Sequence, residues 1–237
     1  MNADEKEFER QLEQAKLDAM KELAYGASHE INNPLANISA RAQALLRDET
    51  DPDKRRTLEA INQQALRAHE MISDLMLFAR PPALVYEVFD VSEMLEGAYA
   101  ESQEVCGERG IEITIKDIAE PFALNADRSQ LTVAISALVR NAIEAIGTDG
   151  NVTVSAEQAD GSARITVTDD GPGIPADVRK HLFEPFYSGR EAGRGLGFGL
   201  SKCWRIVTEH GGTVEVESPE IGGGTSFTVR LPDNPKS

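Results

Sequence analysis

Apolar and small residues recur at steps of three and four over residues 4–47, which is the period of one face of a long helix. Turn-forming residues at 48–53 interrupt this pattern. A second helix then follows a heptad seam and stops at Arg80-Pro81-Pro82, because proline cannot continue a helix. The first face consists of Phe8, Leu12, Ala15, Ala19, Leu23, Ala27, Ile31, Leu35, Ile38, Ala42 and Leu45, and the seam of Leu58, Ile61, Ala65, Ala68, Ile72, Leu75 and Ala79.

Two long helices joined by a short loop form a hairpin, and a hairpin with so much apolar surface cannot bury it alone. Dimerisation into a four-helix bundle is the simplest way to cover that surface. The alternative is an intramolecular coiled coil against a missing partner. We therefore expect residues 1–82 to be a dimerisation hairpin and residues 83–237 to be a second domain.

The second domain alternates between helical and strand patterns. Residues 111–115 alternate as a half-buried strand, and residues 127–146 contain an apolar stretch typical of a buried helix. We expect a hairpin of residues 151–156 and 163–168, then a helix that ends at His210, and last two strands at 213–218 and 225–231. Helices packed on one face of a mixed sheet would make this domain an α+β sandwich.

Charge narrows the classes of partner. The 237 residues include 24 Lys and Arg against 40 Asp and Glu, so the formal net charge is 24 − 40 = −16. Such a surface repels nucleic acid and anionic membranes alike. An anionic ligand must therefore be held locally by backbone N–H groups, a metal ion or a few cationic side chains.

The cysteines and the chain start bear on location. Cys106 and Cys203 are isolated and fit a reducing compartment. The charged start of the chain is no signal peptide, and no apolar run approaches the roughly 18 residues that span a bilayer. We expect a cytoplasmic segment without membrane contact, although it can belong to a larger, membrane-anchored sensor.

His29 begins a polar cluster on the first predicted helix. It is two residues from both Ala27 and Ile31, so its imidazole should point away from the apolar face, and Asn33 should share its side of the helix. Neutral imidazole is a nucleophile near neutral pH, and Glu30 can orient the ring and take up its proton.

Two further residues belong to this cluster. Asn33 can position a water for hydrolysis of a phosphorylated His29, and Pro34 favours a kink. A surface His–Glu pair is more often only part of a solvated face, and we keep that interpretation for the other three histidines, His69, His181 and His210.

A second cluster has the chemistry of a nucleotide pocket, although the chain has no Walker, Rossmann or protein-kinase glycine motif. Asn141 lies at the polar end of the buried helix, where its amide oxygen can bind Mg²⁺. Asp169 ends a strand and can accept an N–H from a base, while Gly171 and Gly173 let the backbone approach that base.

A glycine-rich run at 195–199 adds a means of holding phosphates. It precedes a helix, so its N–H groups and the helix N-terminus can cradle phosphate oxygens. Arg190 and Arg194 place two cations beside this run. Each feature is weak alone, since most glycine-rich turns are only turns, but their ordered combination is specific.

Over nearly its whole length the chain resembles the histidine kinases, whose ATP domain is similar to the gyrase, heat-shock-protein-ninety, histidine kinase and MutL ATPase superfamily. The matching motifs are HEINNPL at 29–35 (H box), NAIEA at 141–145 (N box), DDGPGI at 169–174 (first glycine box), LFEPFYSGR at 182–190 (F box), GLGFGL at 195–200 (second glycine box), and the closing segments HGGTVEVES and GGGTSFTVRLP.

The resemblance implies a role for each matching position. His29 would receive the phosphoryl group from ATP and pass it to an aspartate of a response regulator receiver domain, with Glu30 as acid/base partner. Asn33 would orient water for dephosphorylation of that regulator. Asn141 would bind Mg²⁺ and Asp169 the adenine amino group. The other nucleotide contacts implied are Ala145, Gly171, Gly173, Arg190, Gly195, Gly197, Gly199, Leu200 and Thr225.

The chain also differs from many relatives. Ala137 stands where they have a second Asn, and the segment 184–200, which the resemblance makes a mobile lid, carries Arg190 where Lys is common. These differences leave two alternatives to a kinase: a phosphatase or scaffold with small kinase flux, and an ATPase clamp. A clamp would leave the His29 hairpin without a purpose.

Overall fold

The structure is a computed structural model that describes residues 30–79, 81–100, 102–116, 118, 121–159, 161–184, 187, 198–219 and 222–233. The chain divides into two compact units, Met1–Pro82 and Ala83–Ser237. No helix among these described residues combines the length and the apolar composition needed to cross a bilayer.

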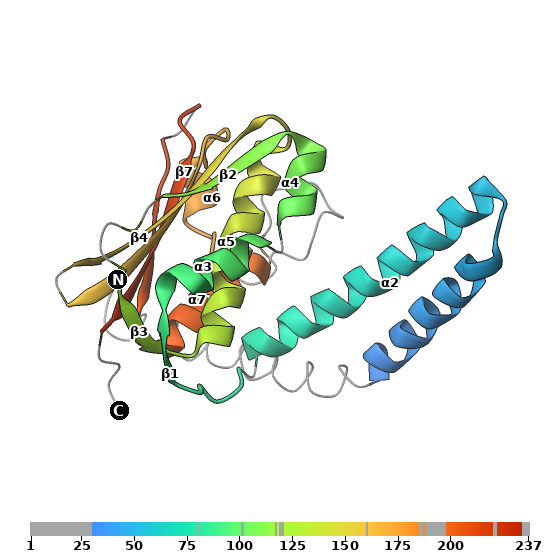
Figure 1. The fold of residues 1–237 in the computed structure, drawn as a ribbon, viewed down its shortest axis with the longest axis horizontal. Helices are drawn as coiled ribbons and strands as arrows, with labels where there is room; N and C mark the ends of the chain where they lie inside the picture. The colour runs from blue at the N-terminus through green and yellow to red at the C-terminus, as the bar shows by residue number, and fades with distance from the viewer. Residues whose placement is uncertain are drawn as a thin grey trace, which may run out of the picture. The chain divides into compact units, whose positions relative to one another are not determined.

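In the part of the first unit that the structure describes, two antiparallel helices, residues 30–48 and α2 (Pro52–Ala79), lie side by side in Figure 1. The loop between them is built by local capping. Asp51 Oδ1 accepts the backbone N–H of Asp53 at 3.0 Å, and Pro52 occupies the first helical position, where its missing N–H costs nothing. The Arg55 guanidinium donates to the carbonyls of Leu46 and Glu49 at the end of the first helix, at 3.0 and 3.1 Å.

The apolar positions of the hairpin form two stripes. One consists of buried residues, which are Ala42 from the first helix and Ala65 and Leu75 from α2. A second stripe remains exposed, and its members are Ile31, Ile38, Leu45, Ile61 and Leu66. The single face expected for the first helix is therefore divided, because one neighbouring helix covers only part of an apolar arc this wide.

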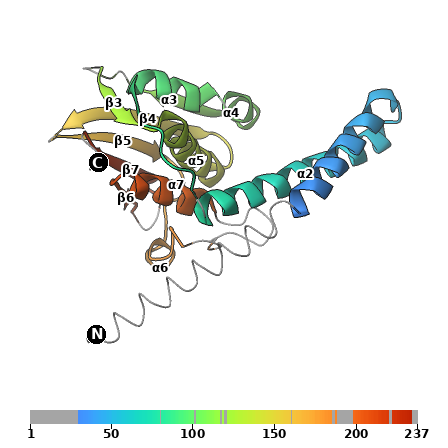
Figure 2. The same cartoon turned by 90° about the horizontal axis from the view of Figure 1, so that it is seen from below.

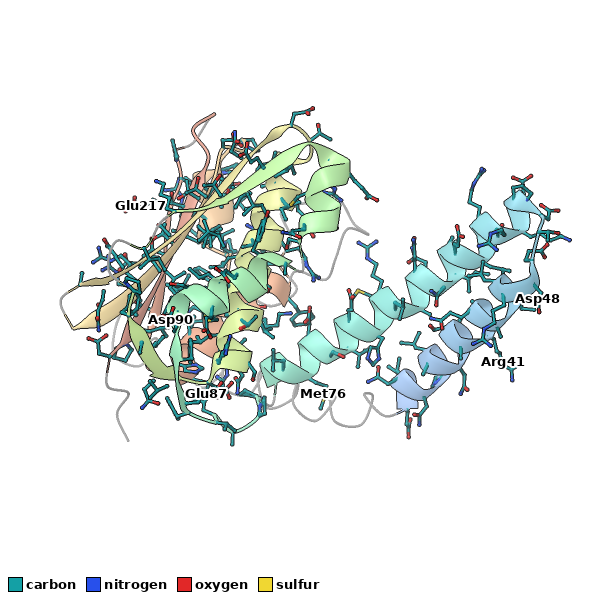
Figure 3. The ribbon with its side chains drawn as sticks, viewed as in Figure 1. Arg41, Asp48, Met76, Glu87, Asp90 and Glu217 are labelled. Carbon is teal, nitrogen blue, oxygen red and sulfur yellow. The ribbon has the colours of Figure 1, made fainter. Side chains whose placement is uncertain are left out.

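Polar contacts also join the two helices. Buried Ser39 donates to Asn62 Oδ1 at 2.7 Å. The hairpin is thus fixed in register by hydrogen bonds as well as by packing. Figure 3 labels Arg41 and Asp48 on the exposed surface of the first helix, and Met76 near the C-terminal end of α2.

The second unit is a mixed sheet with helices on one face, as the sequence predicted (Figure 2). The strand order is β2-β4-β5-β7-β6; β2 pairs in parallel with β4, and the other neighbours are antiparallel. The strands are β2 (Ile111–Ile115), β4 (Gly150–Ala159), β5 (Ser162–Asp169), β6 (Thr213–Glu217) and β7 (Thr225–Pro232). The helices that pack on the sheet are α3 (Val91–Ala100), α5 (Arg128–Ile146) and α7 (Phe198–Glu209).

Alternation along the strands separates a core face from a solvent face. On β5, Ala163, Ile165 and Val167 are buried beneath the helices, while Thr166 and Thr168 lie on the other side and contact Thr228 and Ser226 of β7. Both cysteines belong to the interior. Burial raises the pKa of the Cys106 thiol, against the charge of Arg109, and raises the pKa of the Cys203 thiol to about 12.

Five short elements were not expected from the sequence: β1 (Glu87–Asp90), β3 (Ala123–Ala126), α3, α4 (Gln103–Arg109) and α6 (Ala176–Arg179). The strands β1 and β3 pair with each other as a separate two-stranded sheet. Asp90, labelled in Figure 3, ends β1, and its carboxylate accepts the Ser92 N–H at 2.7 Å at the start of α3. Such short segments carry too few residues for a clear period, so tertiary pairing defines them.

Asp127 caps the N-terminus of α5 and joins it to the start of this unit. Its carboxylate accepts the backbone N–H of Gln130 at 3.0 Å and of Val85 at 2.9 Å, and the hydroxyl of Ser129 at 2.7 Å. Burial alone would raise the pKa of Asp127, but these hydrogen bonds outweigh burial, and the pKa is lowered.

His210 supports the same cap from α7. The Asp127 N–H donates to His210 Nε2 at 3.1 Å, and His210 Nδ1–H donates to the Ile206 carbonyl at 2.8 Å. The expectation that His210 is a solvated surface residue is wrong, because its side chain is buried with both ring nitrogens hydrogen-bonded.

Replacing Asp127 with Ala should therefore lower the free energy of unfolding by about 2 kcal/mol, the upper end of the range for a helix cap, because the Val85 N–H also loses its acceptor. Urea unfolding measures this value. Asp177→Ala, an exposed acidic residue in the first turn of α6, is the matched control and should change little.

The difference in the free energy of unfolding between wild type and Asp127→Ala should also depend on pH. Since the folded-state pKa of Asp127 is lowered, its stabilisation is complete above the ordinary carboxyl pKa of about 3.9 and is lost as the pH falls through the lowered value. The difference between wild type and Asp127→Ala should be constant from pH 7 to 5 and shrink below pH of about 4. A difference that grows on acidification would contradict the capping role.

Candidate functional site

The polar cluster on the first helix is described from Glu30 onward, and His29 lies outside the described residues. Glu30 and Asn33 are both exposed, and the helix continues through Pro34 to residue 48. The Asn33 carbonyl accepts a hydrogen bond from Asn37 Nδ2 at 3.0 Å, so the Asn33 backbone is engaged while its side chain faces solvent. A carboxylate and an amide are therefore presented outward on the first helix.

The adjacent residue Asn32 faces α2. Its Oδ1 lies 3.0 Å from Nδ1 of His69, and because an amide oxygen only accepts, His69 Nδ1 carries the proton. The sequence interpretation of His69 as a plain solvated residue missed this contact, since it depends on the register of two helices. The pair holds the polar cluster against α2.

Asp169 is the centre of the second cluster. It ends β5 with only 4% of its surface exposed, and its Oδ1 accepts the Gly171 N–H at 2.9 Å. Burial raises the pKa of Asp169; the backbone N–H groups of Gly171 and Thr225 oppose this shift, and the charge of Asp170 adds to it. The result is a carboxyl group with a raised pKa, held in place by two backbone donors.

The neighbouring Asp170 is different, although the two residues are adjacent in sequence. Its carboxylate is exposed and accepts the backbone N–H and the side-chain amide of Asn151, both at 2.8 Å. These hydrogen bonds lower the pKa of Asp170. Asp170 thus joins β5 to β4, while Asp169 is the carboxyl group available inside the site.

Glycines keep the site narrow. A Cβ on Gly171 would lie 2.8 Å from Asp169 Oδ1 and 3.4 Å from the backbone of Ala145, so Gly171 brings the loop after β5 against the end of α5. Gly173 has φ +83° and a Cβ there would lie 2.5 Å from the Pro219 carbonyl oxygen. A side chain at Gly171 would crowd the Asp169 carboxylate, and one at Gly173 would collide with the Pro219 backbone.

Helix α5 contributes Ala145 at this contact and Asn141 one turn earlier on the same side of the helix. Asn141 is half-buried and can offer an amide oxygen. No group of three or more His, Cys, Asp or Glu within the described part of the chain could hold a metal ion. A magnesium ion would therefore need Asn141 together with oxygens supplied by a ligand or water, a donor set that fits Mg²⁺.

The remaining candidates are only partly described. Gly199 and Leu200 lie near the start of α7 as the structure describes it, and backbone N–H groups in the first turn of a helix can bind an anion. Arg190, Gly195 and Gly197 lie outside the described residues, so their predicted nucleotide contacts remain predictions from sequence. Thr225 starts β7, is buried, and donates its N–H to Asp169.

The structure thus brings Ala145, Asp169, Gly171 and Thr225 together through direct contacts. A separate surface groove of about 550 Å³ lies between α4 and β2 and is lined by none of the predicted site residues. The buried Asp169 carboxyl group can accept a hydrogen bond from an amino group such as that of a purine base.

Two families match the chain. Residues 19–83 match the His Kinase A (phospho-acceptor) domain, and residues 126–235 match the histidine kinase-, DNA gyrase B- and HSP90-like ATPase. The first match spans the helical hairpin and the second spans most of the sheet domain.

Relatives extend across both regions. Sporulation kinase C of Bacillus subtilis (strain 168) is 33% identical over 93% of this chain and 50% of its own length, and sensor histidine kinase ZraS of Escherichia coli (strain K12) is 32% identical over 92% and 47%. The chain thus spans about half the length of these relatives.

Solved structures agree in fold. Full-length ShkA in complex with AMPPNP superposes with a TM-score of 0.78 at 26% identity, covering 91% of this chain and 46% of that one. The catalytic domain of histidine kinase ThkA superposes with a TM-score of 0.58 at 30% identity, covering 64% of this chain and 97% of that domain. ThkA in complex with response regulator TrrA gives a TM-score of 0.68 at 25% identity over 97% and 66%.

These matches, together with a helical hairpin followed by a mixed sheet with helices on one face, show that the chain belongs to the sensor histidine kinases of two-component systems.

Proposed function

We propose that this chain binds Mg·ATP in its second unit, transfers the γ-phosphoryl group to His29, and passes that group to an aspartate of a response regulator receiver domain. The observation that carries the proposal is the buried Asp169 carboxyl, fixed by the N–H groups of Gly171 and Thr225 at the end of α5. The AMPPNP complex of the related ShkA supports nucleotide binding in this fold.

The described residues suggest how a nucleotide is held. Asp169 accepts a hydrogen bond from the adenine amino group, and Gly171 lets the ring pass close to the backbone. The start of α7, with Gly199 and Leu200, offers N–H groups to the phosphates, and the resemblance adds contacts from Arg190, Gly195 and Gly197. Magnesium, when bound through Asn141, supplies neutralisation of the phosphate charge.

The phosphoryl step follows from the polar cluster on the first helix. One ring nitrogen of His29 attacks the γ-phosphorus, a P–N bond forms, and the bond between that phosphorus and the bridging oxygen breaks as ADP leaves. The opposite ring nitrogen loses its proton to Glu30, whose exposed carboxylate stands next to His29 in the sequence. The Asn32–His69 hydrogen bond supports this segment from α2.

The second transfer uses the phosphohistidine as donor. A carboxylate oxygen of a receiver aspartate attacks the phosphorus, the P–N bond breaks, and the proton taken up by Glu30 returns to the ring, which leaves as neutral imidazole. The complex of the related ThkA with TrrA supports a response regulator as the partner. Both substrates suit a cytoplasmic location for this segment.

A homodimer is part of the proposal because a single hairpin leaves an apolar stripe uncovered. Ile31, Ile38 and Leu45 recur every seven residues on the first helix, and each has more than a third of its surface exposed. A second copy of the hairpin presents the same stripe, so a four-helix bundle covers both.

Phosphatase activity toward the phosphorylated regulator is a second component of the proposal. Its support is Asn33, whose exposed side-chain amide projects one helical turn beyond the position of His29 in the sequence. An amide in that place can orient a water for in-line attack on the regulator's aspartyl phosphate.

Incubation of the wild-type chain with γ-labelled ATP and Mg²⁺ should give label that is lost in acid and stable in base, as expected of a phosphohistidine. His29→Gln should retain no label, because it lacks the nucleophile, while His181→Gln, an exposed histidine of the second unit, should remain labelled. Equal labelling of wild type and His29→Gln would refute the assignment.

Asn33→Ala should slow loss of phosphate from the phosphorylated regulator by about tenfold to a hundredfold while leaving the labelling of His29 in place. Phosphate release is the measurement. Asn37→Ala, which removes an exposed amide one turn later, is the control and should behave as wild type. An unchanged rate in Asn33→Ala would remove the phosphatase component alone.

Ile38→Glu should weaken the dimer by about a hundredfold or more, since two charges per dimer would enter the apolar contact. Sedimentation equilibrium over a concentration series measures the dissociation constant. Ala44→Glu places the same charge on another exposed side of the helix and should leave the dimer intact. A wild-type chain that is monomeric throughout would contradict the proposed bundle.

A further inference from the structure

Two segments far apart in the sequence lie against each other beside Asp169: the loop 170–174 that follows β5, and the described part of the connection between β6 and β7, which is residues 218–219 and 222–224. Their backbones are joined by hydrogen bonds from Gly224 N–H to the Gly171 carbonyl, at 3.0 Å, and from Gly222 N–H to the Pro172 carbonyl, at 3.1 Å. The spacing between the two segments therefore determines the shape of this side of the site.

The Ser218 hydroxyl lies between these segments and bonds to both. Ser218 Oγ accepts the Ile174 N–H at 2.7 Å, and its own hydrogen has the Gly224 carbonyl as nearest acceptor at 3.0 Å. Thr225 Oγ1 lies 3.2 Å from the same oxygen, and the Pro219 carbonyl lies 3.3 Å away. Ser218 is 7% exposed, so water cannot readily replace these contacts.

The groups joined by Ser218 are the ones that hold Asp169. Gly171, in the first segment, and Thr225, directly after the second, each donate a backbone N–H to the Asp169 carboxylate. The Gly224 backbone also packs closely against Asp169, since a Cβ on Gly224 would clash with the Asp169 carbonyl oxygen. A shift of either segment would therefore move a donor away from the carboxylate.

We propose that Ser218 is a positioning residue for the nucleotide base, which fixes through its hydroxyl the two N–H donors that orient the Asp169 carboxylate. The inference rests on the proposed nucleotide binding. It assigns to Ser218 no contact with ATP and no part in the phosphoryl step. Loss of the hydroxyl should therefore weaken ATP binding and leave the rate at saturating ATP nearly unchanged.

Titration of the full chain with ATP and Mg²⁺ tests this split. Ser218→Ala should raise the dissociation constant for ATP, and the KM of autophosphorylation, by about tenfold, with kcat within about twofold of wild type. Ser218→Thr, which keeps a hydroxyl, should recover most of the affinity. Ser226→Ala is the matched control, because it removes a hydroxyl that bonds Thr168 on the solvent face of the sheet, and it should bind as wild type.

The outcomes separate the two proposals. Wild type that binds no ATP overturns both the function and the role of Ser218. ATP binding that is abolished by Asp169→Asn but unchanged in Ser218→Ala overturns only the role of Ser218, as does a loss of affinity that Ser218→Thr fails to recover. If Ser218→Ala does not fold, amide exchange of the wild type decides: slow exchange of the Ile174 N–H without nucleotide supports the inference, and fast exchange contradicts it.

Discussion

The packing of α5 across the inner face of the sheet is the constraint on which the second unit depends. Its buried side includes Leu131, Ile135 and Leu138, each at most 1% exposed, and such burial is the main favourable term in folding. Its N-terminus is capped by Asp127, and its C-terminal end at Ala145 meets Gly171. Helix α5 thus positions two parts of the unit. Its Asp127 cap holds Val85 near the start of the unit, and its C-terminal end holds the loop after Asp169.

Two adjacent carboxyl groups at the end of β5, Asp169 and Asp170, behave in opposite ways. Asp170 is exposed and accepts two hydrogen bonds from Asn151, so its charged form is favoured. Asp169 is buried, and its charged form is tolerated only because Gly171 and Thr225 donate to it. A buried carboxylate lowers stability at neutral pH, and that cost is typical of a residue retained for binding.

Elements with a clear apolar pattern were predictable from the sequence, and elements without one were not. The heptad seam of α2, the buried stretch of α5 and the alternation of β2, β5 and β7 were recognised, and the structure has these elements where they were expected. In β1, β3 and α6, each four residues long, no period can be recognised, so tertiary pairing defines them.

The candidate site shows the same division. Asp169 and its glycines stand in one short motif, and the sequence alone singled them out. Ser218 and His69 were missed because their roles depend on partners such as Ile174 and Asn32, which are 44 and 37 residues away. A contact of that separation depends on sheet order and helix register, which one sequence does not specify.

The burial of both cysteines has a practical meaning for spectroscopy. Cys106 and Cys203 are at most 5% exposed and have raised pKa values, so few of their thiols are in the reactive thiolate form near neutral pH. A cysteine introduced at an exposed position such as Ala44 would then be the preferred point of attachment for a fluorophore or spin label. A chain labelled at that position can report conformational changes without removal of its natural thiols.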